Sequence, residues 1–238
     1  MSRTKIFRII FCIVFAILLV CIVVAFFIAK KLFSDQGIRR TPVSEINVRD
    51  SRAAQMKTAA ALSRIRNARP DSPPEELRLT KDEFNALTET LLNLSGQVSK
   101  EMAVNGIRLQ DTALRLADDS LRLFYSRDTH VKTPFGSRIN FEIDMALRIE
   151  NGESQMTLGR TRMGGMAMPS ALRAKIEEGW RTFQQTPEHR KMLDSIESFS
   201  VKNGALHVKY RPYEARKNFA PSALKTAEML LNPFGAMQ

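Results

Sequence analysis

The chain has 238 residues and a formal net charge of +11, from 36 basic and 25 acidic residues. Ten of the eleven excess positive charges lie within residues 1–69, and residues 70–238 hold 23 basic and 22 acidic side chains. A nucleic-acid-binding domain carries its basic surface on the domain itself, so this distribution argues against nucleic acid as a partner.

An apolar segment near the N-terminus predicts a transmembrane helix. Residues 9–29 are 21 consecutive apolar residues, and at about 1.5 Å per residue such a helix covers the roughly 30 Å hydrocarbon core of a bilayer. A cleaved signal peptide is the alternative, but its apolar region is shorter, roughly 7 to 15 residues, and ends at a small-x-small site. We therefore expect an uncleaved anchor over residues 9–29, after a basic tail over residues 1–8.

Basic residues flank both ends of this segment, so the positive-inside rule does not separate the two orientations. The short N-terminal tail is typical of signal anchors that leave the C-terminal part outside the cytoplasm. We expect a single-pass protein of the inner or plasma membrane with an extracytoplasmic domain. Candidate contacts to the membrane surface are Lys30, Lys31, Arg39 and Arg40, each able to contribute about 1 kcal/mol near anionic lipid; the alternative is that they are topological flanks.

The region after the anchor reads as a basic juxtamembrane linker over residues 30–74. Asp50 is a candidate N-cap, and the alanine-rich sequence that follows favours a helix over residues 50–68. A cluster of helix breakers from Arg69 to Pro74 then marks the expected boundary of the main domain. We expect that domain over residues 75–212, and a C-terminal tail over residues 213–238 with a short helix between Pro221 and Leu231.

The start of the main domain predicts a strand followed by a helix. Residues 77–79 alternate between leucine and arginine, and Thr80 to Glu83 fit a capping box, in which the Thr hydroxyl and the Glu carboxylate accept from each other's backbone N–H. Leucines then recur at helical spacing, and Gly96 is the expected C-cap.

From residue 107 the apolar period falls to two, which predicts strands. The turn residues Asp118 to Ser120 indicate one hairpin. Asn151-Gly152 and Asn203-Gly204 indicate two more, since Asn-Gly supplies the positive backbone angles of a tight turn. Residues 139–149 form the longest alternating strand, with one apolar and one polar face. A helix is expected after Met168-Pro169, limited in length by Pro187.

No catalytic constellation is visible. The three histidines, His130, His189 and His207, lie in different expected elements without ligand spacing, and Ser/His/Asp, zincin, Walker and dinucleotide motifs are absent. Methionines cluster over residues 156–168, and their soft sulfur atoms suit Cu(I), but adaptable packing or lipid contact explains them better. We expect no enzyme activity, no metal and no cofactor.

The fold class expected is α+β, an N-terminal transmembrane helix followed by an antiparallel sheet on amphipathic helices. Over residues 76–211 the order of elements resembles the YpmS-like family of membrane-anchored bacterial proteins. The resemblance rests on the strand and the capped helix with residues 84–87, the hairpins, and Gly165 to Pro169 leading into a helix. It implies a curved sheet like that of tubular lipid-binding domains, with an apolar groove that can hold an acyl chain.

Two functions remain open. The first is a membrane-tethered module that binds a lipid or another hydrophobic ligand, suggested by an anchor together with one-sided apolar strands and methionine-rich connections. The second is a non-enzymatic scaffold subunit of a cell-envelope complex, in which the same residues are ordinary core. The candidate groove residues are Phe141, Ile143, Met145, Leu147, Met166 and Met168.

Overall fold

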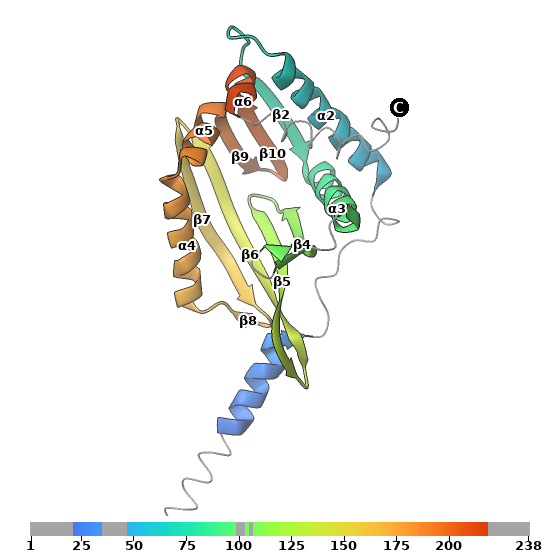
Figure 1. The fold of residues 1–238 in the computed structure, drawn as a ribbon, viewed down its shortest axis with the longest axis vertical. Helices are drawn as coiled ribbons and strands as arrows, with labels where there is room; N and C mark the ends of the chain where they lie inside the picture. Colours follow the sequence, from blue (N-terminus) through green and yellow to red (C-terminus); the bar gives the residue numbers. More distant parts are fainter. Residues whose placement is uncertain (1–20, 35–46, 99–102, 105–106, 219–238) are drawn as a thin grey trace, which may run out of the picture.

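The computed structural model describes residues 21–34, 47–98, 103–104 and 107–218 (Figure 1). A helix over residues 21–32 precedes the first strand. The further helices are α2 (Val48–Asn67), α3 (Lys81–Val98), α4 (Ser170–Gln184), α5 (Pro187–Ser195) and α6 (Pro212–Asn218). The strands are β1 (Phe33–Ser34), β2 (Glu75–Thr80), β3 (Ala103–Val104), β4 (Ile107–Leu116), β5 (Leu121–Thr133), β6 (Gly136–Glu150), β7 (Glu153–Met163), β8 (Met166–Ala167), β9 (Ile196–Lys202) and β10 (Ala205–Tyr210).

Short local signals produce several of these elements. The capping box forms as predicted: the Glu83 carboxylate accepts from the Thr80 N–H at 2.9 Å, and the Thr80 hydroxyl accepts from the Glu83 N–H at 3.3 Å. Both Asn-Gly pairs adopt positive φ, with 53° and 78° at Asn151 and Gly152. These turns join β6 to β7 and β9 to β10, so two hairpins are confirmed.

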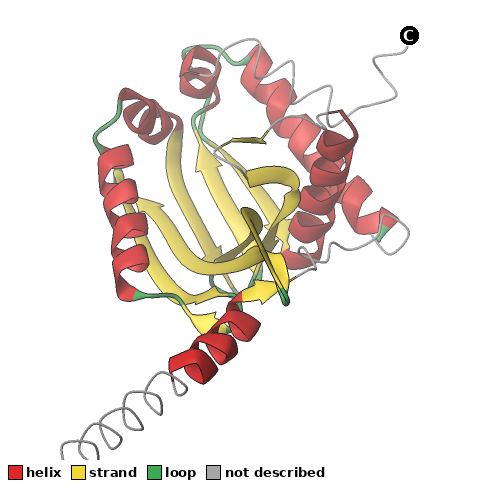
Figure 2. Cartoon of the chain, turned by 60° about the horizontal axis from the view of Figure 1, so that its bottom comes forward, coloured by secondary structure: helices red, strands yellow, loops and turns green. Residues whose placement is uncertain are grey.

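All strand pairs are antiparallel, and β6 is the strand that connects the two halves of the sheet. Near its end, Ile149 pairs with Phe199 of β9, from which β10 and β2 continue the sheet. Earlier in the strand, residues 138–145 pair with β5, followed by β4 and β3. The sheet is strongly bent and is not closed (Figure 2). The fold is therefore α+β with an antiparallel sheet, as predicted.

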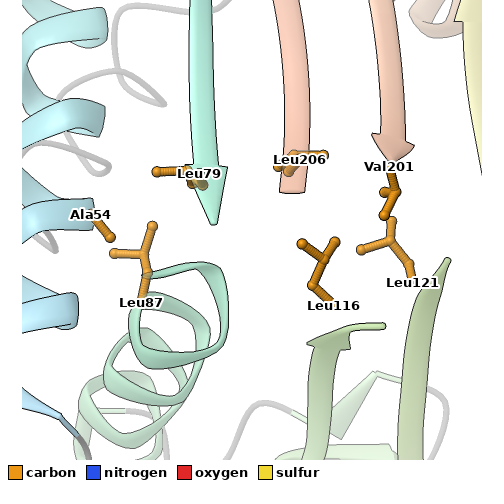
Figure 3. Packing of buried hydrophobic residues seen from close by; sticks show 7 residues of the cluster. All are labelled: Ala54, Leu79, Leu87, Leu116, Leu121, Val201 and Leu206. Carbon is orange, nitrogen blue, oxygen red and sulfur yellow. The ribbon is translucent and has the colours of Figure 1, made fainter. Parts of the chain in front are cut away.

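The main core forms where the two halves of the sheet approach each other. Leu79, Leu206 and Val201 come from one half and Leu116 and Leu121 from the other, and all are buried (Figure 3). Leu87 of α3 and Ala54 of α2 complete this cluster from the helical side. Because residues of both halves meet in one cluster, the apolar face lies on the inside of the bend.

Helix side chains cover the backbone of two outer strands. From α3, the Asn85 side-chain oxygen accepts from the Leu116 N–H at 2.6 Å, and the Thr88 hydroxyl donates to the Leu114 carbonyl. On the opposite side, Arg173 and Gln184 of α4 donate to backbone carbonyls of β7. Unpaired strand edges invite pairing with other chains, so these contacts satisfy groups that would otherwise be available to a partner strand.

Helix α2 differs from its prediction in its packing. It lies inside the expected linker, but it packs against α3, with Ala54 fully buried and Lys57 paired to Glu83 at 2.7 Å. Residues 48–67 therefore belong to the folded unit, and the boundary predicted at residues 69–74 falls within it. The breaker sequence makes only the turn between α2 and β2, because burial of the alanine face of α2 joins the helix to the core.

Three other details differ from expectation. Helix α3 continues to Val98, so Gly96 does not end it. Pro187 follows the end of α4 as predicted but also begins α5, because its fixed φ suits a first helical position. The expected tail from residue 213 begins inside α6, where Ala215 is buried. The helix predicted between Pro221 and Leu231 lies outside the described residues.

The predicted membrane span is described only in part. Residues 9–20 lie outside the described residues, and residues 21–29 are helical. Their apolar side chains are exposed, with 51% of Phe26 and 58% of Phe27 accessible. Within the residues that the structure describes, no helix combines the length and apolarity that a membrane crossing requires.

Candidate functional site

The strand register brings four of the six candidate groove residues onto one face. Phe141, Ile143, Met145 and Leu147 occupy alternate positions of β6, on the inner side of the bend. Their partners on β5 and β7 are also apolar or aromatic, apart from Thr161. These partners are Tyr125, Leu123, Leu121, Leu158, Met156, Met163 and Thr161. The Tyr125 and Phe141 rings stack with centroids 4.6 Å apart, so the face is a continuous apolar surface across three strands.

The six candidates differ in burial. Ile143 and Met168 are core residues, with 5% and 8% of their surface exposed, and they pack with Leu158 in a second cluster. Phe141 and Met145 are half-buried at the margin of that cluster. Leu147 and Met166 are also half-buried. The prediction therefore combined two packed residues with four that keep accessible surface.

A tight turn positions the methionines after β7. Gly164 has φ 61°, and β8 turns back so that Met166 pairs with Met163. The Met168 N–H donates to the Thr161 carbonyl at 3.1 Å, which holds the Met168 side chain in the second cluster with Ile176 of α4. The methionines thus form an apolar continuation of the inner face at one end of β7.

Two hollows are lined by described residues. One of about 720 Å³ lies between the β6–β7 turn and α5, with Arg190, Asp194 and Lys209 among its walls. The other, of about 450 Å³, lies between β7 and α4 and includes Trp180 and Gln184. Their linings are largely polar, and none of the six candidate residues lines either hollow.

The outer face of the sheet is polar. Arg122 of β5 approaches Glu142 at 3.7 Å and Asp144 at 3.5 Å, and Lys209 pairs with Glu197 at 2.6 Å. Such partly exposed pairs contribute little to stability, about 0 to 1 kcal/mol each. They identify the solvent-exposed face of the sheet. The prediction that residues 139–149 have one apolar and one polar face is confirmed.

Tyr125 is the ionisable residue within the apolar face. Burial raises the pKa of its phenol, and the positive charge of Arg127 opposes part of this effect. The phenol is therefore neutral at physiological pH. A neutral, stacked ring offers apolar surface to a ligand without the cost of desolvating a charge.

A buried Ser–His contact was missed by the sequence analysis. The Ser154 hydroxyl lies 2.6 Å from His189 Nε2, and Gln184 donates to the same hydroxyl at 3.2 Å. Ser154 and His189 are 35 residues apart in the chain, and no sequence motif connects them. The Trp180 and Phe183 rings pack against the imidazole.

The surroundings of this pair indicate a structural role. Within the described part of the chain, the His189 imidazole has no hydrogen bond to a carboxylate, which is the contact that a hydrolytic triad has. Both residues are buried, at 6% and 5% exposure. We interpret the pair as a polar link that joins β7 to α4 and α5.

The membrane-surface candidates are only partly placed. Lys30 and Lys31 lie exposed at the end of the first helix, whereas Arg39 and Arg40 lie outside the described residues. Among the residues with described positions, no group of three or more His, Cys, Asp or Glu side chains forms a possible metal site.

Comparison with known proteins gives no relative to place beside this geometry. No protein-family model, curated protein or solved structure matches the chain. The resemblance to the YpmS-like family therefore stays a prediction.

Proposed function

We propose that this protein is a membrane-tethered extracytoplasmic module that binds a lipid or another hydrophobic ligand on the inner face of its sheet. The observation that carries the proposal is the half-buried state of Phe141, Met145 and Leu147 on a bent, continuously apolar face. Apolar side chains that retain accessible surface gain about 25 cal/mol for each Å² that a ligand covers.

The tether is the second part of the proposal. It is supported by 21 consecutive apolar residues at positions 9–29 and by the exposed apolar side chains of residues 22–28. A helix with apolar side chains all round is typical of a membrane span. The bilayer is then the proposed site of the protein, in the inner or plasma membrane, and the nearby lipid is the proposed source of ligand.

The alternative is a scaffold subunit of a cell-envelope complex with no ligand. One observation favours it: Ile143, Leu158 and Met168 pack together as an ordinary core. In this reading, the remaining half-buried residues only surround that core, and envelope proteins are the partners.

Native mass spectrometry of a chain from Asn47 to Gln238, purified from cells, distinguishes the two functions. A stoichiometric bound lipid is expected if the inner face is a binding site. Leu147→Asn and Arg148→Asn provide a matched pair, since these neighbours point to opposite faces of β6. Only Leu147→Asn is expected to lose the lipid. A lipid-free wild-type domain would favour the scaffold.

A further inference from the structure

The hairpin of β5 and β6 extends beyond the core to the first helix (Figure 1). Its tip is a short turn in which the Thr133 hydroxyl donates to the Gly136 carbonyl at 2.6 Å and accepts from the Phe135 N–H. The Phe135 ring meets the Phe26 ring edge to face, with centroids 4.8 Å apart and planes at 78°. The tip of the hairpin is therefore in direct contact with the helix that leads into the predicted span.

Backbone contacts fix the end of that helix against the sheet. Phe33 and Ser34 pair with Ile139 and Arg138 near the start of β6. The Gly165 N–H donates to the Lys31 carbonyl at 2.7 Å.

Gly164 leaves the space that this contact requires. A Cβ atom at Gly164 would lie 2.5 Å from the Lys31 carbonyl oxygen, so a larger residue would displace the helix end. The first helix, the hairpin tip and the β7–β8 turn are thus in mutual contact. The depth of the helix in a membrane would therefore also fix the depth of the hairpin tip.

The depth of Phe26 in the membrane follows from its position in the helix. The predicted span ends at Ala29, and Phe26 lies four residues before Lys30. At about 1.5 Å per residue, Phe26 is about 6 Å below the level of Lys30. Phe135, in contact with Phe26, lies at a similar level.

The charges around the tip have the sign that an anionic surface requires. Lys30 and Lys31 are exposed at the end of the helix, and Lys132 is exposed beside the tip. Pro134, at the tip itself, is exposed and uncharged. An apolar tip with adjacent lysines matches an anionic bilayer, since lysines attract acidic headgroups while apolar groups enter the acyl boundary.

We propose that residues 132–136 form a second membrane contact, in which Pro134 and Phe135 enter the bilayer interface beside the anchor and Lys132 meets anionic headgroups. This inference rests on the proposed anchor. The second contact would also bring the bilayer close to the proposed binding face, because β6 runs from this tip to Phe141 and Met145. The hairpin then orients the inner face of the sheet relative to the bilayer that supplies the ligand.

Site-directed spin labelling of the full chain tests the proposal. Cys12 and Cys21 are replaced by alanine, so that one introduced cysteine carries the nitroxide. The labelled positions are Pro134→Cys at the tip, Glu153→Cys at the start of β7 beside the other end of β6, and Val24→Cys in the predicted span. The protein is reconstituted in bilayers of phosphatidylcholine and phosphatidylglycerol, and collision rates with oxygen and with a water-soluble nickel complex report depth.

The expected result is that the label at Pro134 lies about 5 to 10 Å below the headgroups, with an oxygen-to-nickel collision ratio several times that at Glu153. A ratio at Pro134 equal to that at Glu153 overturns the proposal. In that case the label at Val24 shows whether the anchor also fails. If the Val24 label lies in hydrocarbon, only the tip contact is refuted; if it lies in water, the proposed anchor is refuted as well. Lys132→Cys provides a second labelled position near the tip. Its oxygen-to-nickel collision ratio is expected to lie between the ratios at Glu153 and Pro134, since Lys132 meets the headgroups.

Discussion

The two apolar clusters of the inner face differ in what covers them. The main core joins Leu79, Leu116 and Leu206 with side chains from α2 and α3, and its members are buried. The second cluster joins Ile143, Leu158 and Met168, which are equally buried. Half-buried apolar residues surround both clusters, but among the described residues the second has three buried members where the main core has seven.

The difference follows from the helices rather than from the strands. Two helices, α2 and α3, supply Ala54 and Leu87 to the main core. Helix α4 has no buried residue and contributes Ile176 to the edge of the second cluster. The main core therefore receives buried side chains from two helices, whereas no buried helix side chain of the described residues joins the second cluster.

Removal of α2 is expected to have the largest effect. A chain that begins at Pro74 lacks Ala54 and the Lys57–Glu83 ion pair, and exposes apolar surface of Leu79 and Leu87. We expect it to lose cooperative unfolding, as followed by circular dichroism during heating. A chain that begins at Asn47 is the control and is expected to fold. Equal melting of the two chains would show that the core does not need α2.

Leu116→Ala tests the main core directly. Leu116 is 1% exposed, and truncation of a buried leucine costs about 2 to 5 kcal/mol because it removes contacts and leaves a cavity. Urea unfolding measures this change as a shift in midpoint. Leu172→Ala is the matched control, since Leu172 is exposed on α4 and its truncation is expected to change stability by less than about 0.5 kcal/mol.

Met145→Ala tests the inner face where the two clusters adjoin, because Met145 packs against both. Met145 is half-buried, so we expect a loss below about 2 kcal/mol, under the range for fully buried residues. A ligand that binds only the folded state raises its stability in proportion to the logarithm of its concentration. Lysophospholipid is therefore expected to raise the melting temperature of the wild type more than that of Met145→Ala. A loss as large as that of Leu116→Ala would show that Met145 lies in closed core and not on an open binding face.

Glu83 is expected to give the smallest effect, and one that depends on pH. Burial raises the pKa of its carboxyl, but hydrogen bonds from Lys57 and the Thr80 backbone, with the charge of Lys57, outweigh burial and hold the pKa below the usual 4.5. The stabilisation is therefore fully present above about pH 4.5 and is lost as the pH falls through the lower folded-state pKa.

Glu83→Gln keeps an oxygen for the Thr80 N–H but removes the charge, whereas Glu83→Ala removes the cap as well. We expect Glu83→Ala to cost about 1 kcal/mol at neutral pH, as other cap losses do, and Glu83→Gln to cost less. Urea unfolding at a series of pH values is expected to show a weaker acid dependence in both variants. An unchanged acid dependence would mean that the Lys57 contact does not stabilise the fold.

Several elements were predictable because their signals are local. The capping box at Thr80 and the turns at Asn151 and Asn203 depend on residues within three or four positions of one another. The alternation over residues 139–149 likewise fixed which side chains share a face. The candidate residues of β6 were found for this reason, but their burial was not, because burial depends on which helix lies opposite each position.

The sequence by itself determined the apolar segment at residues 9–29, the capped start of α3, the two Asn-Gly hairpins and the two faces of the long strand, since each follows from composition, a short motif or periodicity along the chain. Only the tertiary structure decided that α2 joins the core, that Ser154 meets His189, and that Phe135 meets Phe26. Each of these contacts joins residues far apart in the chain. Local pattern carries no information about such pairs, because their approach is set by the bend of the sheet and by the packing of all its layers.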